Sequence, residues 1–287
     1  MRIILIGANG QLGCDLVKTL AAADLVPLTH QDVDICEPVG LRTVLRSYAP
    51  DLVINTAAYH KVDECEINIE KTFAVNTFGV RNLAFACREQ NCALLHLSTD
   101  YVFGNKTVAH HIPYPETELP NPINTYGIAK LAGEYFVRHI LERYWIVRTQ
   151  WLYGLAGASG KGGNFVELML RLAGEGRQIK VVNDQIGSPT YTVDLARKIA
   201  QLVDTQNYGL YHITNGGECT WYQFACKVWE LAGLRPDAQP TTTEAFGAVA
   251  ARPEYSVLDN AALRTIGLDD MRPWPEALVA YFQEREV

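Results

Sequence analysis

A tyrosine and a lysine four residues apart are the side chains of this sequence best suited to chemistry on a carbonyl. Tyr126 and Lys130 share one face of a helix that we predict to begin near Asn124. The charge of an ammonium makes a nearby phenol more acidic, and Lys130 could also hydrogen-bond the ribose of a nicotinamide cofactor. The phenol could then donate a proton to a carbonyl oxygen as hydride arrives on the carbon, while Thr99 hydrogen-bonds that oxygen. Together the three side chains predict a site for carbonyl reduction.

Each of these residues also has an ordinary structural explanation when it is taken alone. Tyr126 could be half buried, Lys130 could be a solvated helix lysine, and Thr99 could cap the end of a strand. The case for a site therefore depends on the fold. Ligands of open α/β sheets bind at the carboxyl ends of the strands, so we ask whether the three residues reach that edge.

A glycine-rich loop near the start of the chain predicts a dinucleotide site. Gly7, Gly10 and Gly13 directly follow the apolar residues 3–6 and lead into a helical stretch. Glycine allows a tight turn out of the strand, close approach of the backbone to a pyrophosphate, and close packing of helix on strand. The anion then meets the N–H groups at the start of the helix. The spacing is GxxGxxG, and its position after a strand and before a helix favours a pyrophosphate-binding loop.

The second predicted strand ends without the acidic residue that usually holds the adenine ribose. Residues 27–30 read Pro-Leu-Thr-His. His30 could face the 2′-phosphate of NADP, Asp32 or Asp34 could hold the ribose, and all three could equally belong to a plain surface loop. Both NADPH and NADH therefore stay open as the cofactor.

Short apolar runs alternate with helical stretches in the first half of the chain. Strands are expected at 3–6, 25–28, 52–55, 94–97 and 145–148, and helices at 12–22, 40–48, 69–90 and 130–143. Strands that are apolar throughout are typical of a parallel sheet covered on both faces, because parallel neighbours are joined by crossover helices. The pattern predicts an α/β fold with a doubly wound, Rossmann-type parallel sheet. Thr99 then lies at the carboxyl end of the fourth strand, where ligands bind.

The alternation of apolar strands and helices ends after residue 153. From there on, helical spacing recurs at 164–172, 221–232 and 274–283, whereas 183–192 is rich in turn residues and 236–253 shows little pattern. We predict a dinucleotide-binding domain over residues 1–153. Residues 154–287 are expected to form mainly a smaller substrate-binding lobe, interleaved with returns to the main sheet.

Composition and charge narrow the function further. The formal net charge of −7 argues against a large nucleic-acid interface. No apolar run approaches the roughly 18 residues that a membrane span needs, and the first residues do not resemble a secretory signal. The seven cysteines form no CxxC pairs, which is typical of reduced thiols in the cytoplasm and predicts no metal site. We therefore expect a cytoplasmic enzyme that acts on a small molecule.

These motifs resemble the extended short-chain dehydrogenase/reductases and, among them, the dTDP-4-dehydrorhamnose reductase family. Two strings, Ser98-Thr-Asp-Tyr-Val-Phe103 and Asn183-Asp-Gln-Ile-Gly-Ser-Pro-Thr190, are more specific than the glycine loop and set the family apart from sugar-nucleotide epimerases. The likeness runs almost from end to end. The other matching segments are 7–13, 55–64, Asn76, 126–134, 148–153, 163–165 and 251–253.

The resemblance implies reduction of the 4-keto group of dTDP-4-dehydro-6-deoxy-L-mannose to dTDP-L-rhamnose with NADPH or NADH. It implies Thr99, Tyr126 and Lys130 as the catalytic trio. The residues implied to line the cofactor, besides Tyr126 and Lys130, are Gly7, Gly10, Gln11, Leu12, Gly13, Asp34, Ile35, Ala57, Ala58 and Tyr59. The residues implied to contact the sugar nucleotide are Thr99, Asp100, Tyr101, Tyr126, Trp151, Asn164 and Arg252. Trp151 would offer a stacking surface and Arg252 a phosphate donor, although a core tryptophan and a surface arginine are ordinary alternatives.

Some members of this family dimerise through a metal held by acidic residues. Asp15 lies where the first of these ligands would be, but near Val193 the nearest carboxylate, Asp194, is out of register. The sequence therefore predicts no bound metal. Whether the chain forms a homodimer stays open.

Two other functions stay open from sequence alone. The chain could be another sugar-nucleotide oxidoreductase or epimerase of the same superfamily. It could also be a non-catalytic regulatory protein similar to the β subunit of methionine adenosyltransferase, which resembles these reductases. The intact trio of Thr99, Tyr126 and Lys130 disfavours a purely regulatory role, although one fold can host enzymes and regulatory proteins.

Overall fold

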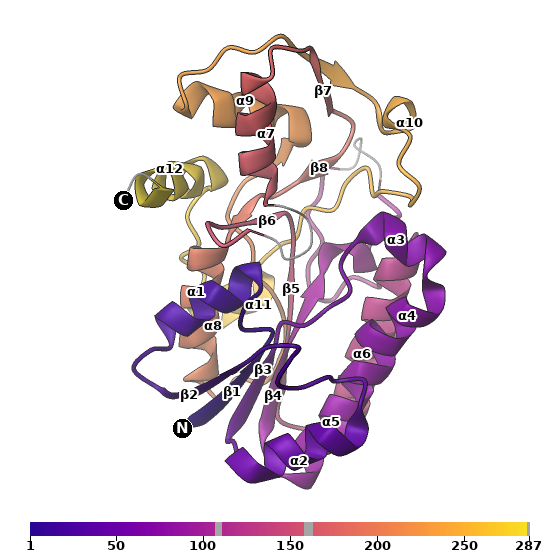
Figure 1. Cartoon of the computed structure of the whole chain (residues 1–287), viewed down its shortest axis with the longest axis vertical. Helices are drawn as coiled ribbons and strands as arrows, with labels where there is room; N and C mark the ends of the chain where they lie inside the picture. Colours follow the sequence, from indigo (N-terminus) through magenta and orange to yellow (C-terminus); the bar gives the residue numbers. More distant parts are fainter. Residues whose placement is uncertain (107–110, 158–162, 286–287) are drawn as a thin grey trace.

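A computed structural model describes residues 1–106, 111–157 and 163–285. Its centre is a six-stranded sheet in the order β10-β5-β4-β3-β1-β2, and every neighbouring pair is parallel (Figure 1). The strands are β1 (Arg2–Ile6), β2 (Asp24–Leu28), β3 (Leu52–Asn55), β4 (Ala93–Thr99), β5 (Tyr144–Thr149) and β10 (Gly209–His212). The chain order reverses between β1 and β3, which is where a Rossmann-type sheet binds its dinucleotide.

Alternating side chains of one strand feed two separate cores. Ile3 and Leu5 of β1 pack into the core on one face of the sheet, and Ile4 and Ile6 pack into the core on the other. Successive residues of a strand point to opposite faces, so a strand that is apolar throughout must be covered on both sides. The predicted doubly wound sheet is confirmed.

Helices cover both faces of the sheet (Figure 1). One face carries α1 (Gln11–Thr19), α8 (Thr192–Val203) and α11 (Ala261–Thr265). The other carries α2 (Pro38–Tyr48), α5 (Val80–Glu89) and α6 (Thr125–Ile140). The predicted helix over 69–90 is divided into α4 (Ile69–Phe73), a π-helical turn η1 (Ala74–Gly79) and α5, and it is preceded by α3 (Val62–Ile67).

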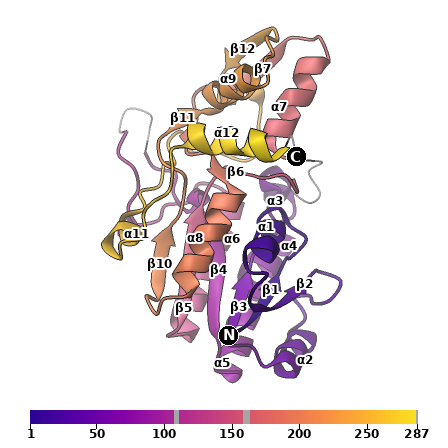
Figure 2. The ribbon, with the colours of Figure 1, turned by 90° about the vertical axis from the view of Figure 1, so that its left-hand side faces the viewer.

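A third core lies beyond the carboxyl ends of the strands (Figures 1 and 2). Its helices are α7 (Phe165–Gly174), α9 (Trp221–Leu231) and α12 (Trp274–Arg285), with α10 (Thr243–Phe246) nearby. Short strand pairs accompany them: β7 (Ile179–Val182) with β12 (Ala238–Thr241), β8 (Ile186–Gly187) with β11 (Cys219–Thr220), and β6 (Leu152–Tyr153) with β9 (Thr190–Tyr191). The described residues after 153 build most of this lobe, and they also contribute β10 to the sheet and the helices α8 and α11 to one of its faces. None of the described helices is long and apolar enough to cross a membrane.

Candidate active site

The glycine loop between β1 and α1 has the shape that the sequence predicts. Gly7 adopts a φ of +86°, and a Cβ on this residue would lie 2.6 Å from Thr56 Oγ1. A Cβ on Gly13 would lie 2.1 Å from the carbonyl oxygen of Gly7. The first position therefore needs glycine for its turn, and the last needs it for contact between helix and strand.

The start of α1 offers free donors to an anion. No side chain caps the helix at Gly10, and its first turn carries no acidic residue. The amide Nε2 of Gln11 is buried there without a hydrogen-bond partner. Because the first N–H groups of a helix also lack partners within the helix, the site suits a pyrophosphate. The residues present therefore fit a dinucleotide.

Replacing Gly13 with alanine should weaken NADPH binding at least about tenfold, because the new methyl would force α1 away from β1. Overpacking of this kind costs about 1–3 kcal/mol. Isothermal titration measures the affinity for NADPH, and urea unfolding measures the change in the free energy of unfolding. Gly40→Ala in α2 is the matched control, since a Cβ there meets nothing within 4 Å. Equal NADPH affinities of the two variants would contradict the proposed packing.

The loop after β2 is held mainly by its own residues. Asp32 accepts hydrogen bonds from the backbone N–H and the hydroxyl of Thr29 at 2.8 and 2.7 Å, and Asp34 accepts one from the N–H of Cys36 at 2.8 Å. The two bonds from Thr29 lower the pKa of Asp32. Ile35 is buried in the core, whereas His30 is exposed. The imidazole of His30 is therefore accessible, whereas the carboxylates of Asp32 and Asp34 are already hydrogen-bonded within the loop. Titration with NADPH and with NADH decides which cofactor the chain prefers.

The loop after β3 is fixed by two asparagines. Asn55 Oδ1 accepts a hydrogen bond from Ala57 N at 3.1 Å. Asn76 accepts one from Tyr59 N and donates one to Tyr59 O, both at 2.9 Å. Asn76 lies in the π-helical turn η1, and such turns often mark functional sites. One local bond to Ala57 and two bonds between Tyr59 and Asn76, 17 residues away, thus hold the predicted cofactor segment 57–59.

The structure brings Thr99 and Tyr126 together at the carboxyl end of β4. Thr99 caps the short 3₁₀ helix η2 (Asp100–Val102) by accepting from Tyr101 N at 3.1 Å, and it is close enough to Tyr126 to act on the pKa of its phenol. The rings of Tyr101 and Tyr126 meet edge to face with centroids 5.8 Å apart. Helix α6 begins where it was predicted to begin, and Asn124 caps it by accepting from Gly127 N at 2.8 Å. A strand end and a helix start therefore position the proton donor.

Lys130 is buried one turn further along α6. Its Nζ donates to the carbonyl of Leu97 at 2.6 Å and lies 3.3 Å from Nε2 of His96. Burial lowers the pKa of Lys130 to about 8. The expected acidification of Tyr126 by Lys130 is not found, since burial and the charge of Asp100 raise the pKa of this phenol instead. A raised pKa keeps the phenol protonated, which suits a proton donor.

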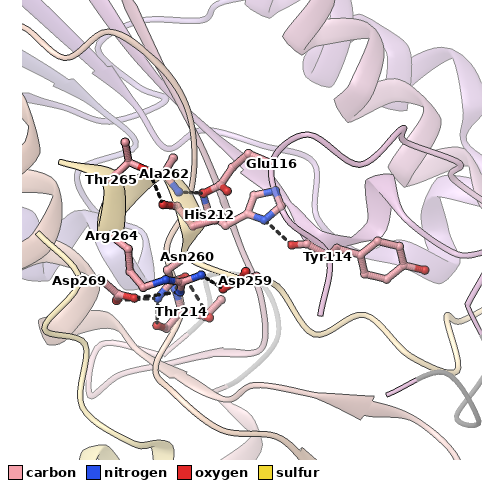
Figure 3. Close-up of polar contacts among 11 residues, drawn as sticks. Tyr114, Glu116, His212, Thr214, Asp259, Asn260, Ala262, Arg264, Thr265 and Asp269 are labelled. Carbon is pink, nitrogen blue, oxygen red and sulfur yellow. Dashed lines mark hydrogen bonds and ion pairs between the residues drawn. The ribbon is translucent and has the colours of Figure 1, made fainter. Parts of the chain in front are cut away.

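A buried ion pair lies between α6 and β5. Nε and Nη2 of Arg148 donate to the two carboxylate oxygens of Glu134 at 2.9 and 2.6 Å, and Ser98 Oγ donates to the same carboxylate at 2.5 Å. Nη1 of Arg148 faces His212 Nε2 at 3.4 Å, and His212 Nδ1 donates to the carbonyl of Tyr114 (Figure 3). Burial and the charge of Arg148 lower the pKa of His212 to about 3. This network fixes α6 to β4, β5 and β10.

Trp151 and Arg252 stand at the border between the sheet and the smaller lobe. Trp151 follows β5 and stacks on Trp221 of α9, with ring centroids 3.6 Å apart. Arg252 pairs with Asp63 at 2.9 Å and lies over the ring of Tyr101. An aromatic surface and a guanidinium thus reach the edge that holds Thr99 and Tyr126.

Asn164 is engaged in structure. It caps α7 by accepting from Glu167 N at 3.0 Å, and its amide group donates to Gly154 O and to the hydroxyl of Tyr281. Both amide hydrogens are used within the chain. A substrate contact through them would require one of these bonds to break.

Asp15 and Asp194 are each held by other side chains. Asp15 accepts from Thr192 Oγ1 at 2.6 Å and lies 3.4 Å from Lys18 Nζ. Asp194 forms a bidentate pair with Arg272. Among the described residues, no three His, Cys, Asp or Glu side chains gather as metal ligands.

The fold and the trio define the class of protein, an NAD(P)H-dependent oxidoreductase of the short-chain dehydrogenase/reductase type. Residues 1–287 match the model of the RmlD substrate binding domain family. The chain belongs to this family.

Similar proteins cover nearly the whole chain. The dTDP-4-dehydrorhamnose reductase of Streptomyces griseus is 39% identical over 98% of this chain and 93% of its own length. The spore coat polysaccharide biosynthesis protein SpsK of Bacillus subtilis is 38% identical over 99% and 98%. The crystal structure of dTDP-4-dehydrorhamnose reductase from Bacillus anthracis in complex with NADP is 42% identical, with a TM-score of 0.93 over 99% of both chains.

Proposed function

We propose that the chain reduces the 4-keto group of dTDP-4-dehydro-6-deoxy-L-mannose, using NADPH or NADH, and releases dTDP-L-rhamnose. The observation that carries the proposal is the protonated, buried phenol of Tyr126 beside Thr99 at the carboxyl end of β4. The glycine loop that fits a dinucleotide stands at the same edge of the sheet. Family membership over the full chain supports the choice of substrate.

Tyr126 acts as the general acid of this reaction. When bound, the reduced nicotinamide supplies a hydride to the carbonyl carbon. The π electrons of the carbonyl move to its oxygen, and the oxygen takes the proton of the Tyr126 hydroxyl. The resulting phenolate regains a proton from solvent before the next turnover. Thr99 stabilises the charge that develops on the oxygen through a hydrogen bond.

Other residues orient the two reactants. Lys130 would bind the ribose next to the nicotinamide; its ammonium has three donors, and the contacts with Leu97 and His96 leave one for a ligand. Trp151 offers a face for stacking, and Arg252 offers a guanidinium to the diphosphate. Orientation of this kind lowers the entropic part of the barrier.

Oxidation of NADPH and of NADH with the keto sugar nucleotide, generated in situ, tests the proposal. We expect consumption of at least one of the two cofactors in proportion to added sugar nucleotide. UDP-hexoses are the matched alternative substrates, because an epimerase would convert them without net loss of cofactor. Such conversion, with no oxidation on the keto sugar, would reject the proposed function.

A further inference from the structure

A row of buried polar side chains leads away from Tyr126 into the protein. Thr99 stands next to Tyr126 and acts on the pKa of its phenol, and Thr99 Oγ1 donates to Oδ1 of Asp100 at 3.1 Å. Ser256 acts in turn on the pKa of Asp100, and Ser256 Oγ donates to Oε1 of Gln150 at 3.3 Å. All five side chains are at most 9% exposed. Bulk water therefore has little access to correct a hydrogen bond that points the wrong way.

The hydroxyl of Thr99 has one hydrogen and several neighbours that compete for it. Its oxygen already accepts from Tyr101 N at 3.1 Å. If Asp100 is ionised, the carboxylate can only accept, so it takes the hydrogen of Thr99. Thr99 would then present a lone pair to a substrate carbonyl. If Asp100 is protonated, it can donate to Thr99, and the threonine hydrogen becomes available to the substrate.

At the other end of this row of side chains, the number of available hydrogens also limits which bonds can form. Ser256 also has one hydrogen, and Gln150 Oε1 and Asp100 compete for it. A protonated Asp100 has only one hydrogen, which goes to Thr99, so toward Ser256 it can act only as a neutral acceptor. An ionised Asp100 would claim that hydrogen and leave the buried Gln150 oxygen without its donor. Leaving a buried acceptor unpaired is unfavourable. A neutral Asp100 competes for the Ser256 hydrogen less strongly than a carboxylate does, so the bond to Gln150 favours the neutral acid.

We propose that Asp100 is a positioning residue that must be protonated for Thr99 to donate its hydrogen bond to the substrate carbonyl oxygen. The inference rests on the proposed carbonyl reduction and adds a condition to it. Asp100 acts through Thr99 in this role, whatever contact it makes with the sugar.

Electrostatics support the neutral form. Burial raises the pKa of Asp100 to about 7, although bonds from Ser256 and Thr99 oppose the rise. The charge of an ionised Asp100 raises the pKa of Tyr126 and so disfavours the phenolate that proton donation leaves behind. Loss of the Asp100 proton therefore harms both the hydrogen bond and the proton transfer.

Several charged or titratable groups surround Asp100. Tyr101 is its neighbour in η2, and Tyr126 and Lys130 face the site from α6. Arg252, paired with Asp63, lies over Tyr101 and lowers the pKa of that phenol. Among them Lys130, with its pKa lowered to about 8, also loses a proton above neutrality.

The dependence of kcat/KM on pH tests the inference. The alkaline limb of the wild-type profile should lie near 7, giving a fall of about fifteenfold from pH 6.5 to pH 8 if Asp100 and Lys130 both lose protons. Asp100→Asn carries an amide that always donates, so its fall should be about twofold, from Lys130 alone. A wild-type-shaped profile in Asp100→Asn would overturn the inference.

Ser256→Ala is a second variant outside the proposed catalytic and binding residues. The bond from Ser256 lowers the pKa of Asp100, so its removal should move the alkaline limb to higher pH. An unmoved limb would count against Asp100 as the controlling group, even if Asp100→Asn were inactive.

Infrared spectroscopy separates this inference from the proposed function. The C=O band of a protonated carboxylic acid should disappear in wild type with a midpoint near pH 7 and be missing from Asp100→Asn. This measurement needs no substrate. A wild type that reduces no keto sugar but shows the band would reject the proposed function alone, whereas absence of the band would reject the neutral Asp100.

Discussion

Tyr126→Phe should lower kcat by about two to four orders of magnitude, the range that general acid catalysis contributes. The change removes the hydroxyl that donates the proton and removes almost no volume. Because the ring stays in place against Tyr101, the packing around residue 126 is kept. The affinity for NADPH should therefore stay within about twofold, and the loss should appear in kcat. Steady-state kinetics and isothermal titration with NADPH measure the two quantities.

Tyr135→Phe is the matched control for this prediction. Tyr135 lies on the same helix, α6, but its side chain is 54% exposed and belongs to the outer surface. The same chemical change there should leave kcat unaltered. If Tyr126→Phe kept a kcat close to that of Tyr135→Phe, Tyr126 would not be the proton donor.

Arg148→Met should destabilise the fold by about 3–5 kcal/mol, because it leaves a buried carboxylate without its partner. The side chains of Arg148 and Glu134 are only 2% and 1% exposed, and two hydrogen bonds join them. Methionine fills much of the same space as arginine, so the loss of stability comes from the missing charge more than from a change in volume. Urea unfolding measures the change in the free energy of unfolding.

An exposed ion pair gives the comparison. Arg42 and Glu89 lie 3.1 Å apart with side chains 44% and 41% exposed, and exposed pairs contribute about 0–1 kcal/mol. Arg42→Met should therefore change stability by less than about 1 kcal/mol. Adding Glu134→Leu to Arg148→Met should recover much of the stability, since neither charge of this pair then remains buried. Equal losses in Arg148→Met and Arg42→Met would show that the buried pair is not fixing α6.

The sheet could be predicted wherever a strand carries its own signal. Ile3–Ile6 is apolar throughout, and the structure buries alternate residues in two cores. Strand β10 carries no such signal, because Gly209–His212 is short and lies at an edge where only β5 pairs with it. The π-helical turn within 69–90 was also beyond prediction, since it depends on contacts of Asn76 with the distant backbone of Tyr59.

The site divides in the same way. Tyr126 and Lys130 could be predicted because their spacing on one helix is local information, and Thr99 because it ends a strand. The role of Ser256 depends on a loop that returns to Gln150 from 106 residues further along the chain, so no local pattern marks it. The predicted lowering of the pKa of Tyr126 was wrong for a related reason. It depends on how deeply the phenol is buried, which spacing does not report.

Transfer of deuterium from labelled cofactor tests the central claim most directly. NADPH or NADH carrying deuterium at the hydride position is supplied with dTDP-4-dehydro-6-deoxy-L-mannose, and the product is analysed by mass spectrometry and NMR. The account predicts dTDP-L-rhamnose with one deuterium on C4 for each cofactor oxidised, and no such product from Tyr126→Phe on the same time scale. Unlabelled product, or cofactor oxidation without any deuterium on the sugar, would contradict it.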